Sequence, residues 1–233
     1  MNDHISKILK RLEDIGLSDR SGALLYSGNE TIKKGDWYFL GSNPGGHEEE
    51  FEKEQTVKSQ LLKSDSTFNE YFDGEWVSKW KEICPPGQQH HQVNIKNLFV
   101  DLGVDLKNTL STNLCFVRSS MENTYKGSRS RDNELCWSIH EHILSVVTPK
   151  YILANGSTAR NFIKKKILQV NPRALVDEEK KLTENLKCTM TIGSLFLRES
   201  GVTLKNIKLF SVPHLGYYTY YPESAGWIRS RVI

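Results

Sequence analysis

Short apolar runs that end at polar residues, glycine or proline form the main pattern along this chain. Four of them predict buried strands, at 37–40, 111–117, 151–154 and 207–212. Charged runs and apolar positions at helical spacing predict helices at 5–15, 51–62, 95–102, 132–147, 158–168 and 224–232. Strands that alternate with helices indicate the α/β class. We therefore expect a three-layer α/β/α sandwich with a central, mostly parallel four-stranded sheet.

Two further features complete the expected elements. The segment 188–197 alternates imperfectly between apolar and polar residues and predicts a hairpin arm. Asp132 stands where an N-cap is expected for the helix that runs to Val147.

The segment 64–93 departs from the alternation of strands and helices. It is rich in aromatic side chains, including Trp76 and Trp80, and it then runs into Pro85-Pro86-Gly87. Proline and glycine in such clusters interrupt regular structure. We expect an insertion or a lid-like segment here, within one domain that spans residues 1–233.

Composition and charge narrow the classes of partner. The 233 residues carry a net charge of +3 at pH 7, and 38% of them are hydrophobic. A weakly basic chain permits a polyanionic partner but does not require one. No apolar stretch approaches the roughly 18 residues that span a bilayer, and the first residues lack the pattern of a signal peptide. We expect a cytoplasmic protein with no membrane partner.

The cysteines and histidines do not predict a metal site or a bound cofactor. Cys84, Cys115, Cys136 and Cys188 are far apart and form no Cys-x-x-Cys motif. The adjacent pair His90-His91 follows a proline-rich stretch, and neighbouring histidines seldom bind one ion together.

The strand at 37–40 ends in the loop Gly41-Ser42-Asn43-Pro44-Gly45-Gly46. Pro44 has no N–H for a strand ladder, and the glycines let the backbone approach a ligand closely. In an open α/β sheet, ligands bind just beyond the carboxyl ends of strands. A tight turn between a strand and a helix is the structural alternative.

The strand at 207–212 ends in Pro213-His214-Leu215-Gly216. A neutral histidine at a strand end can donate a hydrogen bond to charge that develops on a leaving group. The alternative is a structural histidine packed among the tyrosines that follow it. Together, the Asn43 loop and the His214 loop predict one composite site.

The ordered set of motifs resembles the uracil-DNA glycosylase superfamily. Gly41-Ser42-Asn43-Pro44-Gly45 matches the Gly-x-Asn-Pro-Gly motif of the mismatch-specific and thymine-DNA branches at every defined position. Pro213-His214 fits the second motif, although Leu215-Gly216 stands where Pro-Ser is usual. Thr112-Asn113-Leu114-Cys115 is similar to the strand whose Asn reads the base edge, and 151–159 is similar to the third strand and its turn.

The resemblance implies a fold like that of uracil-DNA glycosylase and a monofunctional DNA glycosylase that acts without metal. Such an enzyme flips a pyrimidine out of DNA and hydrolyses its N-glycosidic bond, which leaves an abasic site. By resemblance, His214 stabilises charge on the base O2, Asn43 places the water, and Asn113 reads the Watson–Crick edge. No lysine stands in either motif, so lyase chemistry is not expected.

Two departures from the family pattern bear on the substrate. Asn43 replaces the hydrolytic Asp of the most active uracil enzymes, which implies a slower reaction. Gly45 replaces the bulky Tyr that blocks substituents at C5, which favours a 5-modified pyrimidine, such as hydroxymethylated or glucosylated cytosine, over uracil. DNA repair and defence against phage with modified DNA are both compatible with such a substrate.

The remaining expected contacts divide between substrate and DNA. The substrate is expected to meet Gly41, Ser42, Pro44, Gly45, Gly46, Phe51 and Tyr217, with Phe51 or a tyrosine after His214 stacked on the base. DNA is expected to meet Arg118, Ser119, Lys126, Arg129, Arg131 and Leu215, since basic and small polar residues suit phosphates. A solvated polar loop is the alternative for 118–131, and the protein is expected to be a monomer.

Two other functions stay open on the sequence alone. A non-catalytic module of the same fold would bind DNA or a base and yield no abasic product. A hydrolase of free nucleosides or nucleotides would not be inhibited by duplex DNA.

Overall fold

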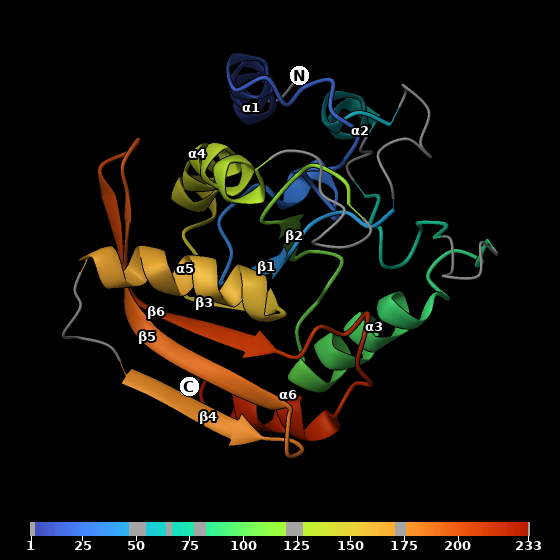
Figure 1. Ribbon diagram of the computed structural model, residues 1–233, viewed down its shortest axis with the longest axis vertical. Helices are drawn as coiled ribbons and strands as arrows, with labels where there is room; N and C mark the ends of the chain where they lie inside the picture. The colour runs from blue at the N-terminus through green and yellow to red at the C-terminus, as the bar shows by residue number, and fades with distance from the viewer. Residues whose placement is uncertain are drawn as a thin grey trace.

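A computed structural model describes residues 3–46, 55–63, 67–76, 83–119, 128–170 and 176–232 (Figure 1). Its centre is one six-stranded sheet with the strand order β2-β1-β3-β6-β5-β4. The strands are β1 (Trp37–Gly41), β2 (Leu110–Asn113), β3 (Tyr151–Asn155), β4 (Val176–Lys181), β5 (Lys187–Leu197) and β6 (Val202–Val212).

The four strands that hydrophobicity predicts form the parallel part of this sheet. β1 pairs with β2 on one side and with β3 on the other, and β3 pairs with β6, all in parallel. The expectation of a four-stranded sheet was nevertheless wrong, because β5 and β4 extend it with two antiparallel pairings. The sheet is therefore mixed.

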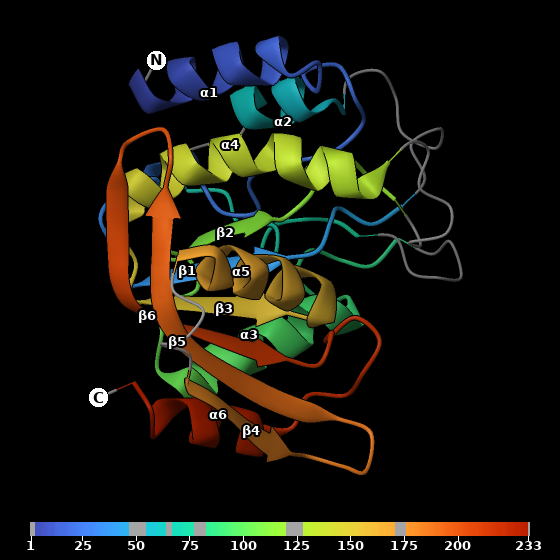
Figure 2. The same cartoon turned by 60° about the vertical axis from the view of Figure 1, so that its left-hand side comes forward.

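The two added strands have different sequence signals. β4 consists of Val-Asp-Glu-Glu-Lys-Lys, and a strand made almost wholly of charged residues carries no hydrophobic signal. Charged side chains at the edge of a sheet also oppose pairing with another chain. β5 covers the predicted hairpin arm and pairs with β6 from Thr189 to Leu197, with an irregularity between Gly193 and Leu195. Figure 2 shows the outer half of this hairpin rising from the sheet towards α4.

Helices cover both faces of the sheet. They are α1 (Asp3–Asp14), the 3₁₀ turn η1 (Asn29–Thr31), α2 (Val57–Lys63), α3 (His90–Leu102), α4 (Arg129–Val147), α5 (Ser157–Val170) and α6 (Pro222–Arg229). α4 begins three residues earlier than expected, because the Ser128 side chain accepts a hydrogen bond from the Arg131 N–H and caps the helix. Asp132, the expected N-cap, lies inside the first turn.

Alternate side chains of the strands separate two hydrophobic clusters. Tyr38 and Leu40 of β1 lie in a cluster with α1, α4 and α5, whereas Phe39 lies in a cluster with α3 and α6. This is the period-two pattern of a strand that is buried on both faces. Figure 2 shows α1 and α2 outside α4, so this side of the sheet carries two levels of helices.

The predicted insertion at 64–93 is described at 67–76 and 83–93, and the latter part enters α3. Tyr71 is buried in the cluster with Phe39 and Phe99, so part of the segment packs on the core. α3 starts five residues before the expected helix, because Gln89 and Gln92 form a capping box. A lid-like role for the segment stays a prediction. Among the described residues, no helix is long and apolar enough to cross a membrane.

Candidate active site

The four parallel strands end along one edge of the sheet. β1 ends at Gly41, β2 at Asn113, β3 at Asn155 and β6 at Val212. Parallel strands place their carboxyl ends on the same side, which is where open α/β sheets bind ligands. The Asn43 loop, Asn113 and the His214 loop are therefore gathered at this edge, with the end of β3 between the two loops.

Backbone hydrogen bonds extend the β1–β2 pairing into the Asn43 loop. The N–H groups of Leu114 and Cys115 donate to the carbonyl oxygens of Gly41 (2.9 Å) and Ser42 (3.0 Å). The Ser119 N–H then donates to the Pro44 oxygen at 3.0 Å. The loop is thus held from the side by residues that follow β2, and Pro44 has no N–H that must be satisfied.

The Asn43 side chain is held by three hydrogen bonds. Its Nδ2 donates to the carbonyl oxygens of Pro44, at 2.8 Å, and Ser119, at 2.7 Å. Its Oδ1 accepts from the guanidinium of Arg129, at the start of α4. The remaining lone pair of Oδ1 is what this amide can offer a water or a substrate. The chemistry open to Asn43 is orientation rather than proton removal.

Asn113 presents a hydrogen-bond donor that the protein leaves unused. The residue is 3% exposed, and its Nδ2 makes no hydrogen bond with any described residue. Gly41 lies directly against it, since a Cβ on Gly41 would stand 2.3 Å from Oδ1 of Asn113. The Tyr26 hydroxyl lies beside the Asn113 side chain and the Gly45 backbone. A buried unpaired donor is costly, and a ligand with an acceptor atom would satisfy it.

His214 is held as a neutral imidazole with a defined tautomer. Its Nδ1 accepts a hydrogen bond from the Gly216 N–H at 3.2 Å, so the ring proton is on Nε2. Burial lowers the pKa of His214 to about 4, because desolvation disfavours the imidazolium. At neutral pH the Nε2–H is therefore available as an uncharged donor.

Asn155 and Gly156 hold His214 from the side of β3. Asn155 is 1% exposed, and its Oδ1 accepts from the Leu215 N–H at 2.9 Å. A Cβ on Gly156 would come within 3.2 Å of the His214 ring. Asn94 of α3 adds hydrogen bonds from its Nδ2 to the carbonyl oxygens of Leu215 (3.0 Å) and Tyr218 (3.3 Å). The His214 loop is thus fixed by two buried amides.

His91 is a site residue that sequence reasoning missed. Asn155 Nδ2 donates to His91 Nε2 at 2.8 Å, so the proton of the neutral ring is on Nδ1. Burial lowers the pKa of His91 to about 3, and the nearby His214 lowers it further. The ring centroids of His91 and His214 are 5.2 Å apart. The sequence signal was a histidine pair in a segment that was expected to be irregular.

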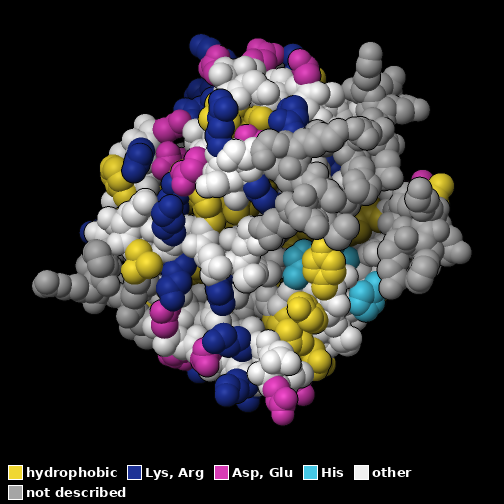
Figure 3. Space-filling view, viewed as in Figure 1, with side chains coloured by type: hydrophobic (Ala, Val, Ile, Leu, Met, Phe, Trp, Pro, Cys, Tyr) yellow, Lys and Arg dark blue, Asp and Glu magenta, His cyan; other side chains and the backbone are white. Residues whose placement is uncertain are grey.

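A row of aromatic rings joins the two loops. Successive ring centroids are 4.7 to 5.7 Å apart along Tyr26, Trp76, His91, His214 and Tyr217. Figure 3 shows histidine side chains at the surface next to hydrophobic ones, on the face that carries α3 and the loop after β6 in Figure 1. Successive rings are tilted by 38° to 67° against one another, so a planar base could stack on the face of a single ring but not on the row as a whole.

A carboxylate and a guanidinium lie behind the Asn43 loop. Arg118 Nη1 donates to the Gly45 carbonyl oxygen at 2.6 Å, and Trp76 Nε1 donates to Glu70 Oε2 at 2.9 Å. Burial raises the pKa of Glu70, while Trp76 and the nearby Arg118 lower it. Burial likewise lowers the pKa of Arg118, opposed by Tyr26 and Glu70. Neither Tyr26 nor Glu70 belongs to a sequence motif, so no local sequence pattern predicts their place in the site.

The expected DNA-contacting residues are placed in different ways. Arg131 is exposed, but Arg118 and Arg129 point their guanidinium groups at the Asn43 loop, and Ser119 is buried. Leu215 is only 2% exposed and packs in the cluster with α3 and α6, so its side chain does not reach the surface. Lys126 lies outside the described residues.

The remaining residues expected to contact the substrate are more exposed to solvent where the structure describes them. Tyr217 is 71% exposed, next to His214. Gly46 has a φ of +92°, a conformation that favours glycine. Gly45 is exposed. Phe51, the other candidate for stacking on the base, lies outside the described residues.

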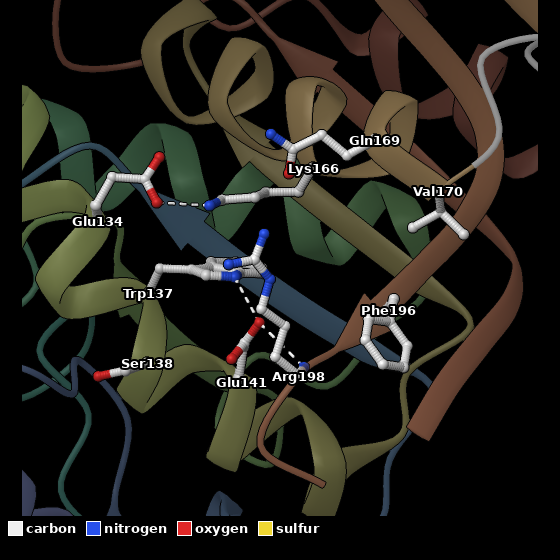
Figure 4. A pocket seen from close by; sticks show the side chains of 9 residues that line it. All are labelled: Glu134, Trp137, Ser138, Glu141, Lys166, Gln169, Val170, Phe196 and Arg198. Carbon is white, nitrogen blue, oxygen red and sulfur yellow. Dashed lines mark hydrogen bonds and ion pairs between the residues drawn. The ribbon is translucent and has the colours of Figure 1, made fainter. Parts of the chain in front are cut away.

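A separate pocket of about 360 Å³ lies between α4, α5 and β5 (Figure 4). Both of its carboxylates already have partners: Lys166 binds Glu134 at 2.5 Å, and Glu141 Oε1 accepts from Trp137 Nε1 at 3.0 Å. The Arg198 N–H donates to the same Glu141 oxygen at 3.3 Å. This pocket is stabilised by its own side chains and shares none with the site at the sheet edge.

Within the described parts of the chain, no cluster of three or more His, Cys, Asp or Glu side chains is arranged to hold a metal ion. Comparison with known proteins finds no matching family model and no significantly similar curated sequence. Functional inference therefore rests on the site itself.

Proposed function

We propose that this protein is a monofunctional DNA glycosylase that hydrolyses the N-glycosidic bond of a flipped pyrimidine. The observation that carries the proposal is the neutral His214, with its proton on Nε2, on the same sheet edge as the unused Nδ2 of Asn113. One donor suits a leaving base whose O2 gains negative charge, and the other suits an acceptor on the edge of the base.

The proposed roles follow from how each group is held. A neutral N–H donor can stabilise an anionic leaving group by a hydrogen bond. The hydrogen bond from the Gly216 N–H to Nδ1 keeps His214 in the tautomer with its proton on Nε2. Asn43 Oδ1 has one lone pair left for a water. The aromatic row from Tyr26 to Tyr217 offers faces for a base that has left the stack.

The fold is compatible with this proposal. The parallel strands β2-β1-β3-β6, covered by helices on both faces, are compatible with an α/β/α sandwich, and β5 and β4 extend the sheet at one edge. DNA as partner, action as a monomer and a 5-modified pyrimidine as the favoured base are parts of the same proposal. Figure 3 shows Lys and Arg side chains on the face that carries the site, with Asp and Glu among them.

The test is abasic-site formation on duplexes that contain uracil, a thymine mismatch or a 5-modified cytosine. We expect cleavage of at least one of these bases without added metal. His214→Ala should lower the rate by roughly 100-fold or more, as the loss of a charge-stabilising donor does elsewhere. Asn43→Ala should also lower the rate, because the water loses the acceptor that orients it. Thr219→Ala, at an exposed position of the same loop, is the control.

A non-catalytic module is the second candidate, and the engaged side chain of Asn43 favours it. Binding of DNA with no abasic product on any duplex would support that function and contradict the glycosylase.

A further inference from the structure

The space beside Gly45 is open. A Cβ added to Gly45 would meet no atom of the described residues within 4 Å, and Gly45 itself is exposed. By the resemblance stated above, this is where a bulky side chain would block a substituent at C5 of the base. The structure therefore leaves room at the position from which a C5 substituent would project.

The side chains around this space are polar and come from other segments of the chain. The Tyr26 hydroxyl lies beside the Gly45 backbone and Asn113, and Arg118 holds the Gly45 carbonyl oxygen at 2.6 Å. Trp76 makes an edge contact with Tyr26 at 5.7 Å between centroids and donates its Nε1 to Glu70. The Glu70 N–H also donates to the Tyr26 carbonyl oxygen at 2.8 Å, which ties the two segments together.

The Glu70 carboxylate has capacity for a further donor. Among the described residues, its one side-chain hydrogen bond is the contact from Trp76 to Oε2. Burial of the carboxylate raises its pKa, as expected for a charge that has lost water without full replacement. A hydroxyl group of a ligand would supply the missing donor, whereas a methyl group would not.

We propose that Tyr26 and Glu70 form a specificity wall that recognises a hydroxyl group carried on C5 of the flipped pyrimidine. This inference rests on the proposed glycosylase function and names the residues that select its substrate. The substituent hydroxyl donates to the Glu70 carboxylate, and the Tyr26 hydroxyl contacts the same group. A base with hydrogen or methyl at C5 leaves the half-buried carboxylate with Trp76 as its one described side-chain donor, and a polar site that lacks a partner in this way rejects an apolar analogue.

The test compares duplexes that differ only at C5: cytosine, 5-methylcytosine, 5-hydroxymethylcytosine and glucosylated 5-hydroxymethylcytosine, together with uracil and 5-hydroxymethyluracil. The readout is the ratio of kcat/KM for a hydroxylated base to that for its unsubstituted parent. For a base that is not cleaved, the ratio of Kd values takes its place. A ratio within one variant cancels any loss of folded protein.

Wild-type protein should prefer the hydroxylated bases. Glu70→Gln should lower the preference roughly 10- to 100-fold, the effect of losing a hydrogen bond to a charged group. Tyr26→Phe should lower it by less, since a neutral bond is lost. Glu75→Gln removes an exposed carboxylate from the same segment and should leave the ratio unchanged.

The outcomes separate the two proposals. Cleavage by the wild type, with ratios in Glu70→Gln and Tyr26→Phe within twofold of wild type, would overturn the specificity wall and leave the glycosylase standing. Wild-type protein that yields no abasic sites on any duplex would overturn the proposed function itself.

Discussion

Gly41 and Asn113 lie on neighbouring strands so close that no side chain larger than a hydrogen fits between them. A Cβ on Gly41 would stand 2.3 Å from Oδ1 and 3.4 Å from Cγ of Asn113. The glycine at this position is therefore tied to the amide that the site presents. Gly41 therefore determines where the Asn113 amide lies, in addition to preceding the turn of the Asn43 loop.

Gly41→Ala should displace the Asn113 amide. We expect destabilisation of about 1–3 kcal/mol, as for overpacking elsewhere, and loss of the proposed base recognition. Chemical unfolding and binding of a modified duplex measure the two effects. Gly45→Ala is the matched control, since its Cβ would meet no atom of the described residues within 4 Å, and equal destabilisation by both changes would contradict this account.

Asn155→Ala should weaken both the His214 loop and the position of His91. The variant leaves the Leu215 N–H and His91 Nε2 without their partner at a position that is 1% exposed. Two buried unpaired groups predict a loss of about 2–4 kcal/mol in the free energy of unfolding. Asn161→Ala, on the exposed side of α5, should change stability little, and equal effects of the two variants would argue against the assigned role.

The buried histidines should make the protein less stable in acid. Burial lowers the pKa of His91 to about 3 and the pKa values of His140 and His214 to about 4, against about 6.5 in an unfolded chain. Between these values the unfolded chain binds protons that the folded protein does not. Stability from this source is fully present above about pH 6.5 and falls as the pH drops towards 4.

Unfolding in urea at about pH 7 and about pH 4.5 measures this dependence. His214→Gln removes one of the three groups and should reduce the difference in free energy between the two pH values. His90→Gln, at an exposed neighbour of His91, serves as control. A larger difference in His214→Gln than in wild type would contradict the assignment of a neutral, half-buried ring.

Glu141 should matter more than Glu134 for the attachment of the hairpin to α4. Glu141 accepts from Trp137 and from the Arg198 backbone, and it is 5% exposed. Glu141→Ala leaves both donors unpaired, which predicts a loss of about 2–4 kcal/mol. Glu134→Gln breaks a surface ion pair with Lys166 and should change stability by less than about 1 kcal/mol. Reversal of this order in thermal unfolding would refute the contrast.

The parallel core was predictable because its strands are short apolar runs with clear ends. The expected strands at 37–40 and 151–154 differ from β1 and β3 by one residue each. β4 was not predictable, because Asp, Glu and Lys at a sheet edge give the same pattern as a solvated loop. Residues 176–181 form a strand because they pair with β5, and this pairing between separate segments cannot be read from the local sequence.

The candidate site was predictable only where a side chain directly follows a strand. Asn43 and His214 could be named from the sequence for this reason, whereas Asn113, the last residue of β2, was named only through the resemblance. Tyr26, Glu70 and His91 could not, because each comes from an irregular segment or a helix start and reaches the site through packing. Leu215 shows the reverse, since its place in a loop suggested exposure while its side chain is buried.

The position of the β5–β6 hairpin in the sequence determines when α1 can complete its packing during synthesis of the chain. Leu195, Leu197 and Leu204 share a cluster with the apolar face of α1, and Arg11 of α1 binds Glu199 near the hairpin tip. Nearly the whole chain separates these contacts in sequence. At 5–20 residues per second, α1 leaves the ribosome roughly 10–40 s before this partner exists. The cluster that contains α1 is therefore completed only after β5 and β6 have been made, and until then Arg11 lacks its partner Glu199.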